Sequence, residues 1–332
     1  MTPVNTFFKD KNYLITGAAG FIGSHIVEYL LKNGAKQVRV LDNLSNGKME
    51  NVDIFKHYAN YEFIEGDITD LDTCLKACEG MDYISHQAAV GSVPRSIKNP
   101  MATTNSNVDG FVNMAFAAKE NGIKRFVYAS SSSVYGDEKT LPKKEEKVGN
   151  PMSPYAISKK TNELYAKVFA DVYGMEFIGL RYFNVFGPRQ DPYGQYAAVM
   201  PLFIKAILNN ETVFIDGDGE QTRDFTFVDN AVQANIKALT TSNSEALNQV
   251  YNVAVGANFS VNYMFNFIRG YLKIGNTPVH RAPRTGDIRD SLADISKAKS
   301  LLGYDPKYSF EDGLPLTIEY FKEVFQKEII NS

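Results

Sequence analysis

The chain has 332 residues and a formal net charge of −3, with 44% hydrophobic and 22% charged residues. This balance is typical of a globular protein with a sizeable core, and the lack of a basic block excludes a surface for a nucleic-acid backbone. No apolar run is long enough to cross a membrane and residues 1–11 are polar, so we expect a cytoplasmic protein with neither a membrane nor a nucleic-acid partner.

The cysteines and histidines do not form a metal-binding pattern. Cys74 and Cys78 lie four positions apart on a predicted helix, and no second pair accompanies them. The histidines are scattered along the chain as His25, His57, His86 and His280. We therefore expect no metal and assign both cysteines to packing.

In chain order, short apolar runs alternate with helical patterns. The first five predicted strands are Tyr13–Thr16, Gln37–Asp42, Tyr61–Ile64, Met81–His86 and Phe126–Ser130. Predicted helices include Gly23–Asn33, Asn107–Asn121 and Tyr155–Tyr173, and the last of these precedes a strand at Glu176–Tyr182. This alternation predicts an α/β fold of the Rossmann type, a doubly wound parallel sheet covered by helices on both faces.

The composition of the chain changes after Gly187, where Gly, Pro, Asp and Asn become frequent. Residues 221–257 return to the earlier pattern, because Gln249–Val255 has the composition of a buried strand. We therefore predict a Rossmann domain of residues 1–186 with 221–257. Residues 187–220 and 258–332 would form a smaller mixed α/β lobe that binds the substrate.

A glycine-rich turn follows the first predicted strand and opens the first helix. Gly17, Gly20 and Gly23 suit a tight turn, a close approach of the backbone to a pyrophosphate, and close helix–sheet packing. Asp42 ends the second predicted strand, where a carboxylate binds the ribose hydroxyls of a dinucleotide and repels a 2′-phosphate. The pattern predicts NAD, rather than NADP, as the cofactor. Asp67, which follows the third predicted strand, is expected to contact the adenine.

Tyr155 and Lys159 lie four residues apart and therefore on one face of a helix, which Ser153 and Pro154 begin as N-cap and first-turn residues. An ammonium group near a phenol favours the phenolate, so we expect Lys159 to lower the pKa of Tyr155. Tyr155 would then act as a base near neutral pH.

These motifs resemble, in order, those of the extended short-chain dehydrogenase/reductase family. The resemblance covers nearly the whole chain and includes the spaced glycines, Asp42, Asp67, residues 131–136 and the Tyr155–Lys159 pair. Within the family the chain looks most like nucleotide-sugar 4-epimerases, notably those acting on UDP-N-acetylhexosamines. The segments that resemble the substrate lobe of those enzymes are residues 181–188, 217–224 and 284–287.

The resemblance implies a role for each matching residue. Tyr155 would take the proton of the sugar 4-hydroxyl, Lys159 would tune it and hold the nicotinamide ribose, and Ser131 would bind the same hydroxyl, assisted by Ser132 and Ser133. The implied cofactor residues are Gly17, Gly20, Phe21, Ile22, Gly23, Asp42, Asn43, Ser45, Asp67, Ile68, Gln87, Ala88, Ala89, Asn107, Tyr155, Lys159 and Tyr182. The implied substrate residues are Gly91, Ser92, Val93, Asn184, Val199, Arg223, Arg284, Asp287 and Ser291. Two arginines can neutralise a diphosphate through bidentate contacts.

Two residues separate this chain from related enzymes of the same family. Dehydratases that resemble it carry an acidic pair where Ser132 and Ser133 stand, and decarboxylases carry a glutamate at the position of Ser133. Neither serine can act as a carboxylic acid, so both reactions are disfavoured. A uronate epimerase stays possible, because a sugar carboxylate needs only a few hydrogen-bond donors.

Ser291 bears on the identity of the sugar. In the resembling epimerases the residue seven positions after the lobe arginine walls the sugar pocket, and here that position after Arg284 holds a small serine. We therefore predict interconversion of UDP-GlcNAc and UDP-GalNAc, with weaker action on UDP-Glc and UDP-Gal. An NAD-binding regulator without catalysis is the alternative from a different class, disfavoured because Ser131, Tyr155 and Lys159 are all kept. The resemblance also implies a homodimer through the helices at Asn107–Asn121 and Tyr155–Tyr173.

Overall fold

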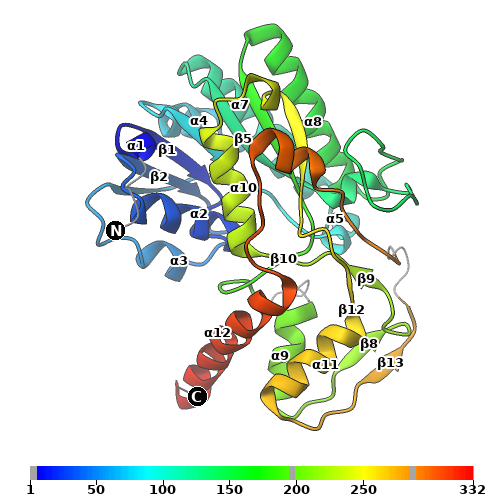
Figure 1. The fold of residues 1–332 in the computed structure, drawn as a ribbon. Helices are drawn as coiled ribbons and strands as arrows, with labels where there is room; N and C mark the ends of the chain where they lie inside the picture. Colours follow the sequence, from blue (N-terminus) through cyan, green and yellow to red (C-terminus); the bar gives the residue numbers. More distant parts are fainter. Residues whose placement is uncertain (1–5, 194–198, 284–288, 332) are drawn as a thin grey trace.

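The computed structural model describes residues 6–193, 199–283 and 289–331. Its centre is a parallel sheet of seven strands in the order β11-β6-β5-β4-β1-β2-β3, drawn in Figure 1. The strands are β1 (Asn12–Thr16), β2 (Gln37–Asp42), β3 (Tyr61–Glu65), β4 (Tyr83–His86), β5 (Arg125–Ser131), β6 (Glu176–Tyr182) and β11 (Gln249–Val253). The predicted doubly wound sheet is confirmed, and its chain order reverses between β1 and β4.

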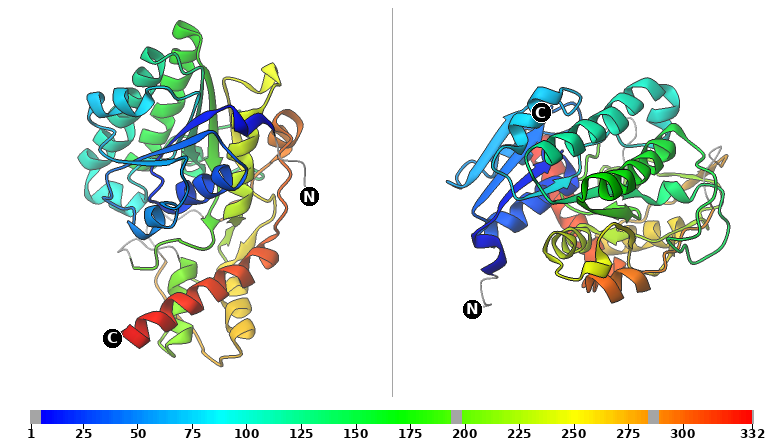
Figure 2. Two further views of the ribbon diagram at one scale, coloured as in Figure 1. Left: turned by 90° about the vertical axis from the view of Figure 1, so that its left-hand side faces the viewer. Right: turned by 90° about the horizontal axis from the view of Figure 1, so that it is seen from above.

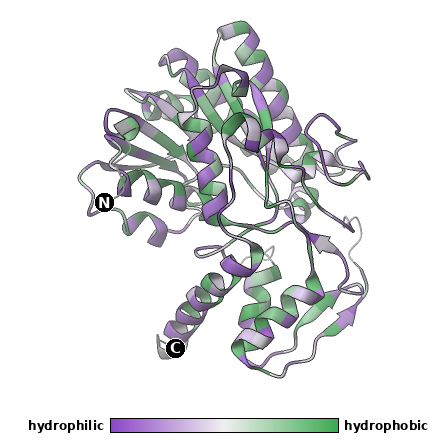
Figure 3. Ribbon diagram, in the orientation of Figure 1, coloured by the Kyte–Doolittle hydropathy of each residue, from purple (hydrophilic) through white to green (hydrophobic). Residues whose placement is uncertain are grey.

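Helices cover both faces of the sheet, as the alternating pattern predicted. On one face, α2 (Phe21–Lys32) packs against α10 (Val228–Thr240). On the other face, α4 (Leu71–Cys78), α7 (Gly110–Glu120) and α8 (Pro154–Tyr173) lie side by side. Much of the sheet is green in Figure 3, because most residues of its central strands are buried, whereas the covering helices show both colours. Short helices α1 (Thr6–Lys9), α3 (Glu50–Asp53), α5 (Val93–Lys98) and α6 (Pro100–Thr104) complete this part.

The predicted boundaries differ from the observed ones in a few places. The predicted helix Asn107–Asn121 begins as a π-helical turn at Asn105–Asp109 and becomes α-helical only at Gly110. The buried Asn107 amide lies in this turn and exchanges two hydrogen bonds with the backbone of Val90, at 2.7 and 3.1 Å. A tertiary contact thus accompanies the wider turn, which periodicity alone does not reveal.

A second group of elements lies beyond the carboxyl ends of the strands. It contains α9 (Val199–Leu208), α11 (Val261–Leu272) and α12 (Phe310–Asn331), which sit together in both Figure 1 and Figure 2. Its two-stranded pairings join β10 (Thr226–Phe227) with β7 (Val185–Phe186), β12 (Phe259–Ser260) with β9 (Thr222–Arg223), and β13 (Val279–Arg281) with β8 (Phe214–Asp216). A separate hydrophobic cluster that runs from Phe186 to Phe325 forms its core.

We propose that the chain divides into the two predicted parts, the sheet domain and the smaller lobe. The return of residues 221–257 to the sheet is supported by α10 and β11, which pack in the sheet domain. One stretch that we placed in the smaller lobe behaves differently, because residues between Ala293 and Tyr304 pack on the core of the sheet domain. No helix within the described parts of the chain has the length and hydropathy needed to span a membrane.

Candidate active site

A cleft of about 540 Å³ runs along the carboxyl ends of the parallel strands. Its walls contain the turn after β1, the loop after β2, the end of β4, the end of β5 and the first turns of α8. Fifteen of the predicted cofactor positions fall within it: Gly17, Gly20, Phe21, Ile22, Gly23, Asp42, Asn43, Ser45, Ile68, Gln87, Ala88, Ala89, Tyr155, Lys159 and Tyr182. A crevice outside the strand ends at the reversal point is where open α/β sheets bind their ligands.

The glycine-rich turn brings three backbone segments into contact. Gly17 has φ +70°, and a Cβ placed there would lie 2.5 Å from the backbone nitrogen of Ala88 at the end of β4. A Cβ on Gly23 would lie 2.6 Å from the Gly17 carbonyl oxygen. Only glycine fits both positions, and the turn therefore opens the amino end of α2 to a negatively charged group.

Asp42 is buried at the end of β2, as the sequence predicted for the ribose contact. Its carboxylate accepts hydrogen bonds from the backbone nitrogens of Ala19, at 2.9 Å, and Leu44, at 2.8 Å. Burial raises the pKa of Asp42, and these two bonds oppose that rise. The carboxylate is thereby fixed between the glycine turn and the loop after β2, on the wall of the cleft.

Asp67, which we expected to contact the adenine, is engaged within the protein. It accepts hydrogen bonds from the Asn43 amide at 2.7 Å and from the backbone and hydroxyl of Thr69, both at 2.8 Å. Its neighbours Gly66 and Ile68 line the cleft. Asp67 therefore fixes the loop that carries Asn43, and its adenine contact stays a prediction.

The predicted residues Gln87 and Tyr182 belong to one buried hydrogen-bond network. The Tyr182 hydroxyl donates to the Gln87 side chain at 2.9 Å and accepts from the Asn235 amide at 2.7 Å. The Asn235 oxygen accepts from Gln87 at 3.0 Å and from Ser85 at 3.1 Å. This network joins β4, β6 and α10 beneath the cleft, and α10 contributes a residue that we had not selected.

Tyr155, Lys159 and Ser131 meet at one end of the cleft. The Lys159 ammonium donates to the Ala129 carbonyl at 2.8 Å, and burial lowers the pKa of Lys159 to about 8. Burial raises the pKa of Tyr155, and a hydrogen bond with Ser131 opposes that rise. Our expectation that Lys159 lowers the pKa of Tyr155 is therefore wrong for this structure, because the ammonium points to a carbonyl and burial dominates.

The serine run after β5 presents its three hydroxyls differently. The Ser131 oxygen accepts from the backbone nitrogen of Ser133 at 3.1 Å, which leaves its proton for the phenol of Tyr155. Ser131 and Ser132 line the cleft, whereas the Ser133 hydroxyl is buried and has no hydrogen-bond partner among the described residues. The predicted roles of Ser132 and Ser133 near the sugar stay predictions.

The segment of Gly91, Ser92 and Val93 lies beside the same end of the cleft. Gly91 lines the cleft, and Ser92, with φ +89°, caps α5 through a hydrogen bond from the Arg95 nitrogen at 3.4 Å. Asn107, predicted as a cofactor contact, bonds instead to the Val90 backbone and to the Ser158 hydroxyl at 3.0 Å. It supports the wall of the cleft from behind.

A second cavity of about 740 Å³ adjoins the first, and Asn184 and Val185 line both. The predicted residues Val199 and Arg223 line this second cavity as well. The Arg223 guanidinium donates to the carbonyl oxygens of Thr222, at 2.8 Å, and Arg289, at 3.0 Å. The structure thus brings a positive group and a polar amide to the cavity that adjoins the cleft.

Ser291 is held next to Arg223 by the backbone. Its nitrogen donates to the Thr222 carbonyl at 3.1 Å, and the Thr222 hydroxyl donates to Asp290 at 2.8 Å. Asp224 accepts from the Ala293 nitrogen at 3.2 Å and so fixes the same stretch. Arg284 and Asp287 lie outside the described residues, so the structure does not place these two predicted contacts.

Several residues that line the two cavities were missed by sequence reasoning. Lys48 and Asp191 form an ion pair of 3.2 Å between the loop after β2 and the loop after β7. The missed residues include Ala19, Asn46, Gly47, Lys48, Asn51, Arg189 and Asp191 in the first cavity and Phe214, Asp216, Gln221 and Arg281 in the second. The turn signal at Asn46-Gly47, shortly after the second strand, could have identified Asn46, Gly47 and Lys48.

Comparison with known proteins gives a family for this fold and site. Residues 13–254 match the model of the NAD dependent epimerase/dehydratase family. A UDP-glucose 4-epimerase from Mycolicibacterium smegmatis is 38% identical over 315 residues, which cover 94% of this chain and 99% of that protein. The chain therefore belongs to the NAD-dependent epimerase/dehydratase family.

Two solved structures resemble the chain over almost their full lengths. A UDP-N-acetylglucosamine 4-epimerase from Methanobrevibacter ruminantium, in complex with UDP-N-acetylmuramic acid, is 42% identical with a TM-score of 0.90 and covers 95% of this chain and 99% of its own. A UDP-glucose 4-epimerase from Thermotoga maritima, with UDP-glucose, is 39% identical with a TM-score of 0.88, at the same coverage. The protein is an NAD-dependent epimerase of this family.

Proposed function

We propose that the enzyme interconverts UDP-GlcNAc and UDP-GalNAc by transient oxidation at C4 of the sugar. The observation that carries the proposal is that the cleft lined by Ser131 and Tyr155 adjoins, at Asn184 and Val185, a second cavity lined by the positively charged Arg223. A phenol can exchange a proton with a sugar hydroxyl, and a nearby cationic group can bind a diphosphate. Together they suit a sugar that is linked to a nucleotide. Ser132 and Ser133 supply no carboxylic acid, which restricts the chemistry to one carbon.

The residues of the cleft fit NAD. The amino end of α2 offers backbone nitrogens to the pyrophosphate, and Asp42 offers a carboxylate to ribose hydroxyls. Lys159 and Tyr155 face the region between Ala129 and Gln87 where a nicotinamide ribose would lie. When bound there, NAD would supply the hydride acceptor and donor for oxidation and re-reduction at C4 of the sugar.

The protein's own part in the reaction is proton transfer and orientation. Tyr155 accepts the proton of the 4-hydroxyl and later returns it, so it acts first as base and then as acid. The backbone nitrogen of Ser133 donates a hydrogen bond to the Ser131 oxygen. The hydroxyl proton of Ser131 is then available for its hydrogen bond with the Tyr155 phenol. Arg223 and Asn184 would hold the nucleotide in the second cavity while the sugar turns beside Tyr155 in the adjoining cleft.

Ser291 supports the preference for an acetylated sugar. Ser291 lies on the stretch that Thr222 and Asp224 fix beside Arg223, and in the proposal its small side chain leaves room for the acetamido group that a tyrosine would fill. The UDP-N-acetylglucosamine 4-epimerase of known structure, at 42% identity, supports the same preference. UDP-glucose and UDP-glucuronate are the alternative substrates, and the substrate panel described below distinguishes them from UDP-GlcNAc.

A panel of UDP-sugars tests the proposal. The purified enzyme is incubated with UDP-GlcNAc, UDP-Glc and UDP-GlcA without added cofactor and then with NAD, and the products are separated by chromatography. We expect UDP-GalNAc as the main product and Ser291→Tyr to suppress its formation while leaving UDP-Glc turnover largely intact. Faster turnover of UDP-GlcA or UDP-Glc by the wild type would contradict the substrate, and no turnover of any sugar with NAD bound would favour a regulator.

We also propose a homodimer, supported by an apolar stripe on α8. Ile157, Leu164, Val168 and Val172 recur at helical spacing, and each is more than half exposed. Phe116 on the neighbouring α7 is 37% exposed. Light scattering should give twice the chain mass, and Leu164→Glu with Val168→Glu should give the monomer; a wild-type monomer at micromolar concentration would contradict the proposal.

A further inference from the structure

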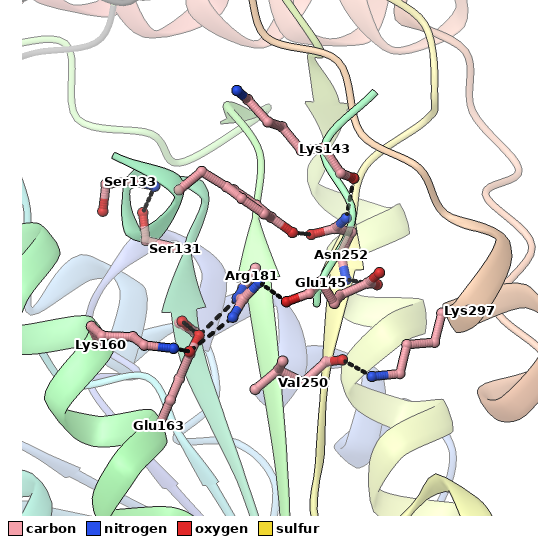
Figure 4. A network of polar contacts seen from close by, with 12 residues as sticks. Ser131, Ser133, Lys143, Glu145, Lys160, Glu163, Arg181, Val250, Asn252 and Lys297 are labelled. Carbon is pink, nitrogen blue, oxygen red and sulfur yellow. Dashed lines mark hydrogen bonds and ion pairs between the residues drawn. The ribbon is translucent and has the colours of Figure 1, made fainter. Parts of the chain in front are cut away.

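A buried ion pair lies directly beneath the candidate catalytic residues. Glu163 follows Tyr155 and Lys159 on the same face of α8, and its carboxylate meets the Arg181 guanidinium of β6 at 2.8 and 2.9 Å. The side chains of Glu163 and Arg181 are 5% and 2% exposed. Figure 4 shows the two groups facing each other between the helix and the sheet.

The pair also contacts the strand that ends in Ser131. The Ser130 hydroxyl donates to the Glu163 carboxylate at 2.8 Å. Ser130 and Arg181 are register partners on β5 and β6, and the next register pair is Ser131 with Tyr182. The Glu163 carboxylate therefore contacts β5 at Ser130 and β6 at Arg181. The next residue on each strand, Ser131 and Tyr182, lines the cleft.

The Arg181 guanidinium is also held by groups other than Glu163. Its Nη1 donates to the Glu145 carbonyl at 3.0 Å, and the guanidinium lies 4.9 Å from the centre of the Tyr135 ring. The Tyr135 hydroxyl donates to Asn252 at 2.6 Å, and the Asn252 nitrogen donates to the Glu145 carboxylate at 2.8 Å. These contacts, partly visible in Figure 4, fix Arg181 from β11 and from the loop after β5.

An ion pair in this position is costly to bury and stabilises folding little compared with apolar packing, so its location calls for another explanation. Burial raises the pKa of Glu163 while Arg181 and Lys160 lower it, and the net shift is downward, which keeps the carboxylate ionised. A charged, bidentate contact has a narrower geometry than apolar packing. It therefore sets the distance between α8 and the end of β5.

We propose that Glu163 is a positioning residue for proton transfer. Through Arg181 and Ser130 it holds α8 and β5 so that the Ser131 hydroxyl meets the phenol of Tyr155. The inference rests on the proposed function, in which Ser131 and Tyr155 exchange the proton of the sugar. A shift of the hydroxyl pair would slow the chemical step and leave the binding of nucleotide and cofactor unchanged.

The chain contains a matched control at the opposite end of the same two strands. Arg125 of β5 and Glu176 of β6 are register partners, and their side chains meet at 2.9 Å with 10% and 14% exposure. This pair joins the same strands at their amino ends, away from the cleft. Glu176→Gln therefore removes a comparable charge from a comparable environment without disturbing Ser131.

The test is a mutant cycle on the full enzyme with NAD and UDP-GlcNAc. Glu163→Gln should lower kcat about 10- to 100-fold with KM and NAD affinity changed by no more than about twofold. In a Ser131→Ala background the same substitution should lower kcat by less than about twofold, because the contact that it positions is already absent. Glu176→Gln should leave kcat within about twofold of the wild type at a similar loss of Tm.

Ser130→Ala keeps the test informative where Glu163→Gln folds poorly. It removes only the hydroxyl that joins β5 to Glu163, and we expect a smaller fall in kcat, about 3- to 10-fold, again at unchanged KM. Equal loss of kcat in Glu163→Gln and Glu176→Gln, or full additivity of Glu163→Gln with Ser131→Ala, would overturn the inference. Retained turnover in Tyr155→Phe and Ser131→Ala would instead overturn the proposed function.

Discussion

The two cavities of this molecule are built in different ways. The cofactor cleft is lined by the ends of parallel strands in one sheet, where register fixes each side chain relative to its neighbours. The second cavity is lined by α9, by the two-residue strand β9, by β8, and by loops between them. Its ordering comes from individual contacts, such as those of Thr222 and Asp224 with the stretch from Arg289 to Ala293.

This difference separates chemistry from selectivity. Groups that transfer the proton and hold NAD must keep their geometry in every turnover, and a sheet supplies that rigidity. Groups that recognise the sugar can vary with little effect on the fold, because they lie on loops and short pairings. The two regions should therefore respond to substitution in different kinetic parameters, kcat for the first and KM for the second.

The largest effect should come from Tyr155→Phe in the cofactor cleft. Loss of the phenolic proton carrier should lower kcat about 10³- to 10⁴-fold, with NAD affinity within about threefold of the wild type. Initial rates by chromatography and NAD titration by calorimetry measure the two quantities. An equal loss of turnover and of NAD binding would show that Tyr155 holds the cofactor and does not transfer the proton.

A smaller effect is expected in the second cavity from Arg223→Met. Removal of one charged donor to a diphosphate should raise KM about 10- to 100-fold and change kcat little. Arg289→Met is the matched control, because that guanidinium is 65% exposed and pairs with Asp218 at 3.0 Å. If Arg223→Met lowers kcat and leaves KM unchanged, the division between the two cavities fails.

The smallest effect is one of stability and lies at Lys159. Its pKa is about 8 in the folded protein against 10.5 for an ordinary lysine, so at pH 7 the buried ammonium costs on the order of 3 kcal/mol. Lys159→Met removes that cost but leaves the Ala129 carbonyl without its donor, so we expect a net gain of about 1–2 kcal/mol with loss of activity.

The pH dependence of that gain identifies its cause. Between pH 8 and 10.5 the unfolded chain binds a proton that folded Lys159 has released, so the wild type becomes relatively more stable as pH rises. Urea unfolding of both proteins without added nucleotide should show the advantage of Lys159→Met shrinking through this range. A difference that is constant from pH 7 to 10.5 would mean that packing, and not the charge, is responsible.

Much of the cofactor cleft was accessible from local patterns. The strands that precede the glycine turn and Asp42 were predicted at almost their observed bounds, because apolar runs between turn signals depend on few neighbours. Arg189 and Asp191 were missed, although they line the same cleft, because they reach it from a loop far along the chain. The predicted contacts of Asp67 and Asn107 illustrate the same limit, since both side chains bond within the protein.

The sequence by itself determined the class of fold and the turn that opens α2, and it placed Tyr155 and Lys159 on one face of a helix, since these depend on spacing along the chain. Only the tertiary structure decided how those residues are tuned. Burial, and not Lys159, sets the direction of the Tyr155 pKa. The carboxylate of Glu163 meets Ser130 and Arg181, which come from two different strands. Desolvation and contacts between distant segments arise only when the chain is packed, so local pattern cannot reveal them.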